Sequence, residues 1–413
     1  MAEAGTFVIV GGGLAGARAA ETLRKEGFDG RVVLIGEELD LPYERPPLTK
    51  EYLRGTSDRA AITVHDAAWY ANQKVELKLG SPVAWVDPKQ GTVTLTTGDR
   101  IHFEKLLLAT GSTARHLGVT GAQIGGVHHL RRVEEADALR ADLVPGKRVI
   151  VVGGGWIGTE VAASARQLGC DVTAIYPGRL PLEGPLGPEL AEVYRDLHLA
   201  NGVTLMPGTK LTAVRGKGRV EEVVTDKGEH LPADVVVAGI GAEPRIELAR
   251  GAGLAIDEGV LVSSLLETSA PGIFAAGDIA QAEHPFYGTQ IRLEHWAAAK
   301  FQGPAAAKSM LGRGEPYDRL PYFYSDQYDL SMEYRGWAPS WERVVIRGDL
   351  ASRAFLAFWI VDGRVSAALN ANTSGKGKVL EALIRSRRFI DRDRLADPSV
   401  PLEELAGIEP AEG

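Results

Sequence analysis

Two short glycine-rich segments have the residue types and spacing of a phosphate-binding turn. They are GGGLAG at residues 11–16 and GGGWIG at residues 153–158, and each carries the pattern G-x-G-x-x-G directly after a β-branched run. In this pattern the first glycine allows a tight turn, the second lets a pyrophosphate approach the backbone, and the third lets a helix pack closely on a strand. The phosphates are then held by free N–H groups at the helix N-terminus. The two segments therefore predict two dinucleotide sites.

The residues expected to meet the adenosine ribose differ between these sites. Glu37 lies 21 residues after Gly16, a spacing typical of a carboxylate that accepts hydrogen bonds from the ribose. After the second motif the corresponding place is taken by the run YPGR, from Tyr176 to Arg179. Without a carboxylate this site does not repel a 2′-phosphate, and Arg179 could pair with one. We therefore expect the second site to tolerate NADPH.

The elements around the motifs predict the fold. Each motif is followed by a helix-compatible stretch that ends in glycine, at residues 17–27 and 159–169, and then by a second apolar run. Strand, turn, helix and strand form the βαβ unit of a parallel sheet covered by helices. Short alternating runs at 203–216, 219–228 and 234–244 predict strands and hairpins, and an aromatic-rich region begins near residue 320. We expect an α/β protein with two Rossmann-like domains.

Composition excludes several classes of function. The chain has 413 residues, of which 45% are hydrophobic, and a net charge of −8, which argues against a general nucleic-acid binder. No signal peptide and no membrane span is visible, so we expect a cytoplasmic protein. The only cysteine, Cys170, excludes an intrachain disulfide and a redox-active cysteine pair. We expect no metal site, because His128 and His129 should point to opposite faces of one strand.

Further segments resemble one protein family along nearly the whole chain. They are LPYERPPLTKEYL (41–53), LLLATGS (106–112), LRRVEEADAL (130–139), GIFAAGDIA (272–280) and YSDQYDL (324–330). Together with the two glycine motifs they resemble the FAD-dependent ferredoxin reductases that serve Rieske-type oxygenases and bacterial cytochromes P450, the putidaredoxin reductase type. The resemblance implies a glutathione-reductase-like fold with an FAD domain at 1–115 and 243–319, an NAD(P) domain at 116–242 and a C-terminal α+β domain at 320–413.

The resemblance also implies roles for individual residues. Lys50 would lie beside the isoalloxazine and Glu160 would meet the nicotinamide amide, and these two are the candidate catalytic residues. The implied FAD contacts are Gly11, Gly13, Ala15, Gly16, Glu37, Lys50, Val83, Ala109, Thr110, Gly111, Arg131, Gly277, Asp278 and Trp296. The implied NAD(P) contacts are Gly153, Gly155, Ile157, Gly158, Glu160, Tyr176, Arg179 and Gly241.

The activity implied by the resemblance is electron transfer. FAD would take a hydride from NADH, the default donor, and pass single electrons to a [2Fe–2S] ferredoxin partner. The protein would be a monomer or a weak homodimer. Tyr322 and Tyr324 depart from the family, which commonly has tryptophan there. The arginine-rich segment at residues 384–394 could steer an acidic ferredoxin or could be a plain solvated face.

Two other classes share this layout. One is the apoptosis-inducing-factor type, which acts chiefly through NADH-dependent partner binding, and the runs at residues 238–257 and 292–299 look somewhat like it. The other is a monodehydroascorbate-type reductase of small molecules. Fast ferredoxin-dependent turnover would favour a ferredoxin reductase over both of these classes.

Overall fold

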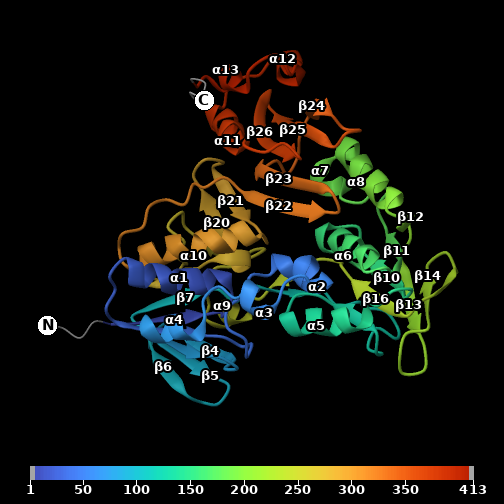
Figure 1. Ribbon diagram of the computed structural model, residues 1–413. Coiled ribbons are helices and arrows are strands. Elements are labelled where there is room, and N and C mark those ends of the chain that lie inside the picture. Colours follow the sequence, from blue (N-terminus) through green and yellow to red (C-terminus); the bar gives the residue numbers. More distant parts are fainter. Residues whose placement is uncertain (1–4, 409–413) are drawn as a thin grey trace. The chain divides into compact units, whose positions relative to one another are not determined.

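The structure is a computed structural model that describes residues 5–408, so the first four residues, on which the signal-peptide expectation partly rests, lie outside it (Figure 1). The chain forms two compact units. The first contains residues up to 46, 57–113 and 242–319, and the second contains 47–56, 114–241 and 320 onward. The three-domain division stays a prediction.

The first unit is built on a five-stranded parallel sheet with the order β19-β7-β1-β2-β3. Its strands are β1 (Thr6–Val10), β2 (Arg31–Ile35), β3 (Val75–Lys78), β7 (Lys105–Leu108) and β19 (Ile273–Ala275). Helices α1 (Leu14–Lys25) and α10 (Trp296–Met310) pack against each other beside this sheet (Figure 1). A strand order that runs outward from β1 on both sides places the turn after β1 at the carboxyl ends of neighbouring strands, where open parallel sheets bind ligands.

Smaller elements complete the first unit. One is an antiparallel sheet of β4 (Val83–Asp87), β5 (Thr92–Leu95) and β6 (Arg100–His102), and another is a mixed sheet in which β20 (Ala280–His284) lies between β18 (Val260–Val262) and β21 (Thr289–Arg292). The others are α3 (Arg59–Ile62), α4 (Ala67–Asn72), α9 (Glu247–Gly251) and the 3₁₀ turn η2 (Gly277–Ile279). Strand β18 pairs with β20 in parallel.

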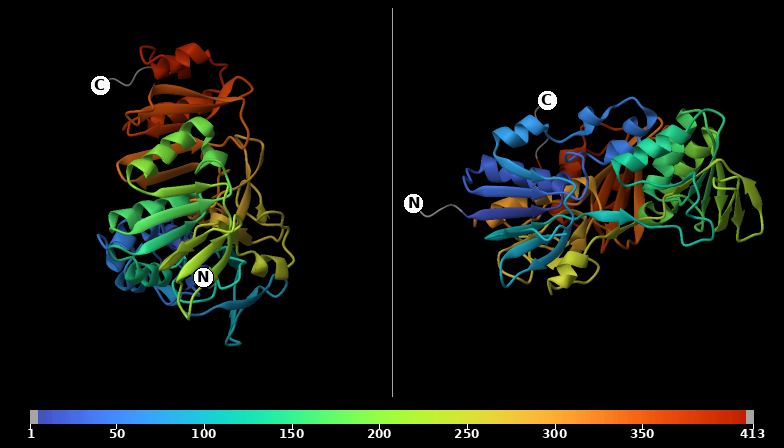
Figure 2. Two further views of the ribbon diagram at one scale, coloured as in Figure 1. Left: turned by 90° about the vertical axis from the view of Figure 1, so that its right-hand side faces the viewer. Right: turned by 90° about the horizontal axis from the view of Figure 1, so that it is seen from below.

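The second unit repeats the parallel design, with the strand order β12-β11-β10-β16-β9. Its strands are β9 (Val127–His129), β10 (Arg148–Val152), β11 (Asp171–Tyr176), β12 (Thr204–Pro207) and β16 (Val235–Ala238), and its helices are α5 (Val133–Asp142), α6 (Trp156–Gln167), α7 (Glu183–Leu186) and α8 (Pro188–Ala200). The antiparallel strands β13 (Leu211–Arg215), β14 (Glu222–Thr225) and β15 (His230–Pro232) extend beyond this sheet (Figure 2).

A second sheet in the same unit is antiparallel, with the order β22-β23-β26-β25-β24. It comprises β22 (Tyr322–Gln327), β23 (Leu330–Gly336), β24 (Arg343–Asp349), β25 (Ala354–Val361) and β26 (Arg364–Ala371), followed by α11 (Gly377–Ser386), α12 (Arg392–Ala396) and α13 (Leu402–Ala406). Apolar side chains of α7 and α8, including Leu186 and Leu190, share one buried core with Leu330 and Trp359 of this sheet. Strand β22 is thereby held near α6, which it contacts.

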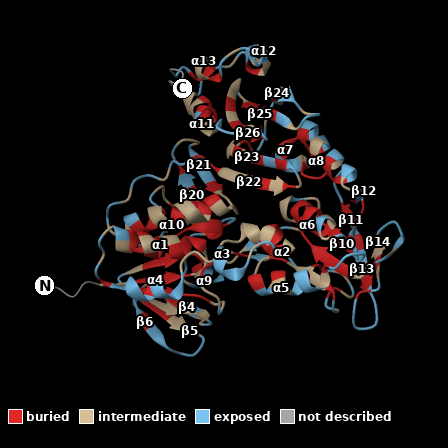
Figure 3. Ribbon diagram, in the orientation of Figure 1, coloured by how far each residue is buried: buried red, intermediate tan, exposed pale blue. Residues whose placement is uncertain are grey.

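Four short elements lie where the chain passes from one unit to the other: η1 (Pro46–Thr49), α2 (Glu51–Arg54), β8 (Ser112–Ala114) and β17 (Ala242–Pro244). Within each unit the buried residues follow the parallel strands and the helix faces turned toward them (Figure 3). The predicted α/β fold class with two Rossmann-like parallel sheets is confirmed.

The predicted helix starts are wrong by one turn. Helix α1 begins at Leu14, not at residue 17, and α6 begins at Trp156, not at residue 159. The reason is that the second glycine of each motif, Gly13 or Gly155, is the extended N-cap residue, so the third glycine already lies inside the helix. The third glycine of each motif, Gly16 or Gly158, therefore lies in the first turn of the helix, where it lets the helix pack closely on the strand.

Candidate functional site

The turn after β1 has the geometry of a phosphate cradle. The backbone N–H of Gly11 donates to the carbonyl of Ile35 over 2.8 Å, and Gly11 has φ +132°, a conformation that favours glycine. A Cβ at Gly11 would overlap the carbonyl of Ala109, and one at Gly16 would overlap the carbonyl of Gly11. A Cβ at Gly13, by contrast, would meet nothing within 4 Å. The middle glycine therefore leaves open space in front of the N-terminus of α1, as a bound pyrophosphate requires.

The turn after β10 repeats this geometry position by position. Gly153 has φ +121°, its N–H donates to the carbonyl of Ile175 over 2.9 Å, and a Cβ there would overlap the carbonyl of Gly239. Gly158 packs on the carbonyl of Gly153, and Gly155 again faces open space. Each unit thus has one turn of the same design at the N-terminus of a helix, and both turns fit a dinucleotide.

The residues around the first turn include one that the sequence did not reveal. Glu37, the expected ribose acceptor, forms an ion pair with Arg245, and both side chains remain partly exposed. The backbone of Arg245 also bonds to the segment that follows β7. The carbonyl of Arg245 accepts from Thr110 Oγ1 over 2.6 Å, and its N–H donates to the carbonyl of Gly111 over 2.9 Å. In the sequence Arg245 directly follows the run AEP (residues 242–244). This run has no ligand-binding pattern, so the sequence did not indicate that Arg245 would meet Glu37.

The Gly277–Asp278 segment lies beside the same turn. Asp278 is buried in η2, and the N–H of Gly277 donates to Gln302 Oε1 over 2.9 Å. A Cβ at Gly303 would overlap the carbonyl of Ala15, so glycine allows α10 to approach α1 closely. The sequence analysis missed Gln302 and Gly303, because the helix AAAKFQGPAAAK shows no local sign of what it contacts.

Other predicted FAD residues are more widely distributed. The indole N–H of Trp296, at the start of α10, donates to Glu44, and Val83 begins β4. His295 precedes Trp296, and burial lowers its pKa to about 4, which keeps the imidazole neutral. Arg131 belongs to the second unit, where its backbone N–H donates to Glu135 over 2.7 Å.

The two candidate catalytic residues form an ion pair inside the second unit. Lys50 Nζ lies 2.8 Å from Glu160 Oε2, and the two side chains are only 5% and 8% exposed. The same oxygen accepts from Thr49 Oγ1 over 2.5 Å, and Glu160 Oε1 accepts from Ser325 Oγ over 2.7 Å. Ser164 Oγ donates to the carbonyl of Thr49 over 2.6 Å and so ties the Thr49–Lys50 segment to α6. Glu160 is therefore a buried carboxylate held by three donors.

The loop after β11 leads to a carboxylate that lies beyond the spacing expected for a ribose acceptor. Glu183, in the first turn of α7, accepts from Arg179 over 2.7 and 3.1 Å and from the N–H of Leu180 over 3.2 Å. The loop between them returns to the glycine turn, because the N–H of Leu182 donates to the carbonyl of Gly154 over 2.8 Å. Arg179 is thus neutralised by Glu183 next to the second turn, while Tyr176 is buried and its ring packs against Gly154.

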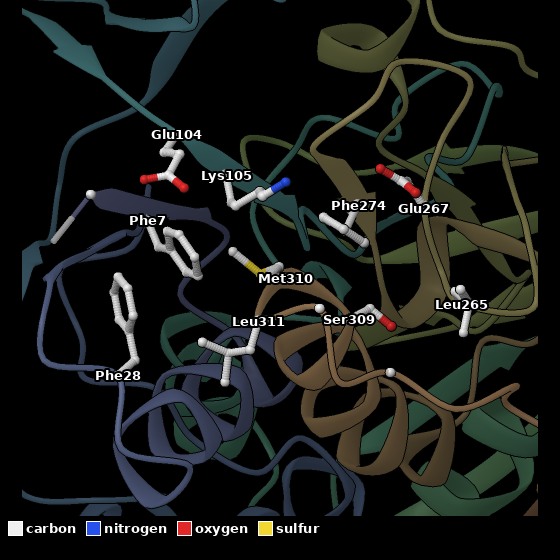
Figure 4. Close-up of a pocket in the computed structure, with 13 residues that line it drawn as sticks. Phe7, Phe28, Glu104, Lys105, Leu265, Glu267, Phe274, Ser309, Met310 and Leu311 are labelled. Carbon is white, nitrogen blue, oxygen red and sulfur yellow. The ribbon is translucent and has the colours of Figure 1, made fainter. Parts of the chain in front are cut away.

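A separate pocket of about 600 Å³ lies in the first unit. Its apolar wall includes Phe7, Phe28, Phe274 and Met310, and Glu104, Lys105 and Glu267 lie around it (Figure 4). Phe7 is near the beginning of β1, whereas the glycine turn follows the end of that strand. The pocket therefore does not belong to the dinucleotide site.

The remaining predicted motif is the histidine pair on β9. His128 bonds Asp142 over 2.8 Å, while His129 accepts from the N–H of Leu117 over 3.3 Å. In the described part of the chain no group of three or more potential ligands could hold a metal ion. Nor is any helix among residues 5–408 long and apolar enough to cross a membrane.

The arginine-rich segment carries less free charge than its composition indicates. Arg385, Arg392 and Arg394 are each paired with a glutamate. Phe389, in the same segment, is 74% exposed and lies under the guanidinium of Arg364. The steering patch and the solvated face both stay predictions for this segment.

The tyrosines that replace the family's usual tryptophans lie on β22. The hydroxyl of Tyr322 donates to Glu333 over 2.8 Å, and burial raises the pKa of Tyr322. Lys50 Nζ lies 5.7 Å from the centre of the Tyr324 ring. An aromatic surface is therefore present beside the buried ion pair.

Two parallel sheets, each with a glycine cradle after its central strand, define a class of enzymes that bind two dinucleotides on two Rossmann-like folds. The chain belongs to the pyridine nucleotide-disulphide oxidoreductase family, which it matches over residues 5–303, and members of this family bind FAD. Residues 322–406 match a second family, described as reductase C-terminal.

Relatives with assigned activities are similar over almost their full length. The ferredoxin–NAD(+) reductase component of the anthranilate 1,2-dioxygenase system of Burkholderia cepacia is 42% identical over 97% of this chain and 99% of its own. Putidaredoxin reductase of Pseudomonas putida is 33% identical over 98% and 97%. The solved covalent complex of putidaredoxin reductase with putidaredoxin contains a chain that superposes with a TM-score of 0.93, at 32% identity and 98% coverage of both chains.

Proposed function

We propose that the protein is an FAD-dependent NAD(P)H:ferredoxin oxidoreductase that supplies electrons to a Rieske-type oxygenase or a cytochrome P450. The observation that carries this proposal is that the chain has two dinucleotide turns but only one cysteine. Cys170 is fully buried, its Sγ lies 3.4 Å from the carbonyl of Val144, and burial raises the pKa of the thiol. The chain has no cysteine pair that could accept electrons from the flavin. The electrons must therefore pass to an acceptor outside the chain. The relatives' assigned activities support a ferredoxin as that acceptor.

In this proposal each predicted site residue has a chemical task. The turn at Gly11 and the buried Asp278 hold FAD, whose flavin accepts a hydride and releases electrons singly. The turn at Gly153 holds the pyridine nucleotide, and the carboxylate of Glu160 accepts from the carboxamide of the nicotinamide. Lys50 pairs with that carboxylate and fixes it in place. The protein contributes position and exclusion of water rather than a nucleophile. The FAD, NAD(P) and C-terminal domain limits and a cytoplasmic location stay parts of the proposal.

The direct test measures kcat/KM for NADH and NADPH with a panel of [2Fe–2S] ferredoxins and cytochrome c as final acceptor. We expect at least one ferredoxin to raise cytochrome c reduction by about tenfold or more over a ferredoxin-free control, a difference of about 1.4 kcal/mol. Equal rates with and without every ferredoxin would contradict the proposal. Slow turnover with a stable complex of reduced enzyme and NAD would indicate the apoptosis-inducing-factor type. Direct reduction of a small radical without ferredoxin would indicate the monodehydroascorbate type.

The Arg179–Glu183 pair predicts how the nucleotide preference responds to substitution. We expect NADH to remain the better donor, because Glu183 already neutralises the cation that a 2′-phosphate would need. Glu183→Gln should release Arg179 and raise the NADPH/NADH ratio of kcat/KM by about five- to tenfold, roughly 1 to 1.4 kcal/mol. Arg179→Ala should lower NADPH turnover and leave NADH turnover nearly unchanged.

Steady-state kinetics of both variants and of the double variant check this prediction. In the double variant the gain from Glu183→Gln should disappear, since it depends on Arg179. If the unaltered enzyme prefers NADH by more than about a hundredfold, 2.7 kcal/mol, the idea of NADPH tolerance is wrong. A gain that persists without Arg179 would mean that Glu183 acts through its own charge.

A further inference from the structure

A chain of buried polar side chains leads from α8 through β22 to Glu160. His198 Nε2 lies 2.9 Å from Gln327 Oε1, and Gln327 Nε2 lies 3.1 Å from Ser325 Oγ and 3.0 Å from Thr159 Oγ1. Ser325 Oγ in turn donates to Glu160 Oε1 over 2.7 Å. Gln327, Ser325 and His198 are each only 1% exposed. Polar groups buried this deeply must satisfy one another, because water does not reach them.

The donor direction along this chain is determined by its two ends. The hydroxyl proton of Thr159 goes to the carbonyl of Gly155 or Trp156, each 3.1 Å away, so Thr159 Oγ1 must accept from Gln327. A carboxylate only accepts, so Ser325 must donate to Glu160 and must itself accept from Gln327. The amide nitrogen of Gln327 therefore faces both hydroxyl groups, and its oxygen faces His198.

This orientation also determines the state of His198. Gln327 Oε1 can only accept, so the imidazole carries its proton on Nε2. Its Nδ1 is buried and has no hydrogen-bond partner among the residues that the structure describes. A second proton on Nδ1 would be buried without an acceptor, and burial lowers the pKa of His198 to about 4. His198 is a neutral donor, and the hydrogen bonds from His198 through Gln327 and Ser325 all point toward Glu160, while one branch leads from Gln327 to Thr159.

We propose that Gln327 is a positioning residue for the pyridine nucleotide site, acting through Ser325 to fix the carboxylate of Glu160. One carboxylate oxygen is held from β22 by Ser325, and the other is held by Thr49 and Lys50. The antiparallel sheet of the second unit thereby takes part in the reaction with NAD(P)H. This inference rests on the proposed function, in which Glu160 binds the nicotinamide carboxamide.

The consequence is that β22 has a task besides any contact with the electron acceptor. A carboxylate fixed from two sides cannot rotate away when a nucleotide enters, so its acceptor geometry is set before binding. Gln327→Glu keeps the size of the side chain, and its ionised form has neither of the two donors of the amide. Ser325 would then turn its proton toward residue 327, and Glu160 would lose a hydrogen bond.

The test separates the two half-reactions of the FAD-loaded enzyme by stopped-flow absorbance. We expect Gln327→Glu and Ser325→Ala each to slow flavin reduction at subsaturating NADH by about tenfold. The rate at which dithionite-reduced enzyme passes electrons to ferredoxin should stay within about twofold. Ser325→Thr, which keeps the hydroxyl, should restore most of the rate of flavin reduction.

A double variant and a matched control distinguish positioning from loss of stability. If Gln327 acts through Ser325, flavin reduction in the double variant Gln327→Glu/Ser325→Ala should be no slower than in either single variant. Tyr194→Phe serves as the control, because Tyr194 lies on the same helix as His198 and its buried hydroxyl has no partner in the described part of the chain. It should change neither half-reaction.

Three results would overturn the inference: unchanged flavin reduction in Gln327→Glu, additive effects in the double variant, or equal slowing of both half-reactions. Failure of the unaltered enzyme to be reduced by NADH, or to reduce any ferredoxin, would instead contradict the proposed function.

Discussion

Lys50→Met is expected to destabilise the protein by about 3–5 kcal/mol and to slow flavin reduction by NADH by about a hundredfold. The Lys50 and Glu160 side chains are 5% and 8% exposed, and their charged atoms are 2.8 Å apart. Methionine preserves the length of the side chain but leaves the carboxylate of Glu160 buried without a counter-charge. Removing one member of a buried ion pair costs more than the pair itself contributes, because the remaining charge stays desolvated.

Urea denaturation followed by tryptophan fluorescence, together with stopped-flow flavin reduction, measures both effects. The control is the double variant Lys50→Met/Glu160→Gln, in which no buried charge is left unpaired. It should recover most of the lost stability but none of the lost rate, because Glu160→Gln replaces the carboxylate that the nicotinamide amide needs. If Lys50→Met is as stable as the unaltered protein, the ion pair is better solvated than the low exposure of its two side chains indicates.

Gly11→Ala is expected to yield protein without bound FAD and to lower stability by more than about 3 kcal/mol. Two causes act together at this position. The φ of +132° is unfavourable for alanine, and the new Cβ would overlap the backbone of Ala109, which cannot move without disturbing β7. Flavin absorbance of the purified protein and its thermal unfolding measure the result.

Gly13→Ala is the matched control for this variant. Gly13 has an extended backbone, and a Cβ there would meet nothing within 4 Å. We therefore expect its stability without cofactor to be nearly unchanged, while its affinity for FAD falls because the methyl group takes the space of the pyrophosphate. Equal destabilisation by both substitutions would contradict the assignment of separate tasks to the two glycines.

A substitution in the second unit that corresponds to Gly13→Ala separates the two nucleotides. Gly155→Ala should weaken binding of NADH and leave FAD bound, because Gly155 faces open space at the N-terminus of α6. A titration with NADH monitored by flavin absorbance checks this. Loss of FAD from this variant would indicate that the second turn does not hold the pyridine nucleotide.

Sequence reasoning predicted the two βαβ units correctly because their signals are local. A β-branched run, three spaced glycines and a helix ended by glycine lie within about 30 residues, so the chain itself brings them together. The same local information placed the helix starts one turn too late, since it assigned Gly16 and Gly158 to the turn instead of the first turn of the helix. The identity of each glycine was therefore easier to predict than the conformation around it.

The partners of the charged site residues were not predictable in this way. Lys50 and Glu160 were named on resemblance, but their ion pair joins positions 110 residues apart, and Ser325 lies a further 165 residues from Glu160. Glu183 lies outside the expected spacing for a ribose carboxylate, and only the return of the loop to Gly154 brings it next to Arg179. Arg245 reaches Glu37 from a segment with no ligand-binding pattern.

By itself the sequence determined the two dinucleotide turns, the α/β class and the absence of a cysteine pair, because these depend on residue types and short spacings. Only the tertiary structure decided which charges are neutralised and which carboxylate is held from both sides. Such pairings depend on how distant segments pack, and the direction of the hydrogen bonds from His198 to Glu160 depends on every buried donor having its acceptor. The second turn lacks an acid at the expected spacing, and Arg179 beside it is paired with Glu183.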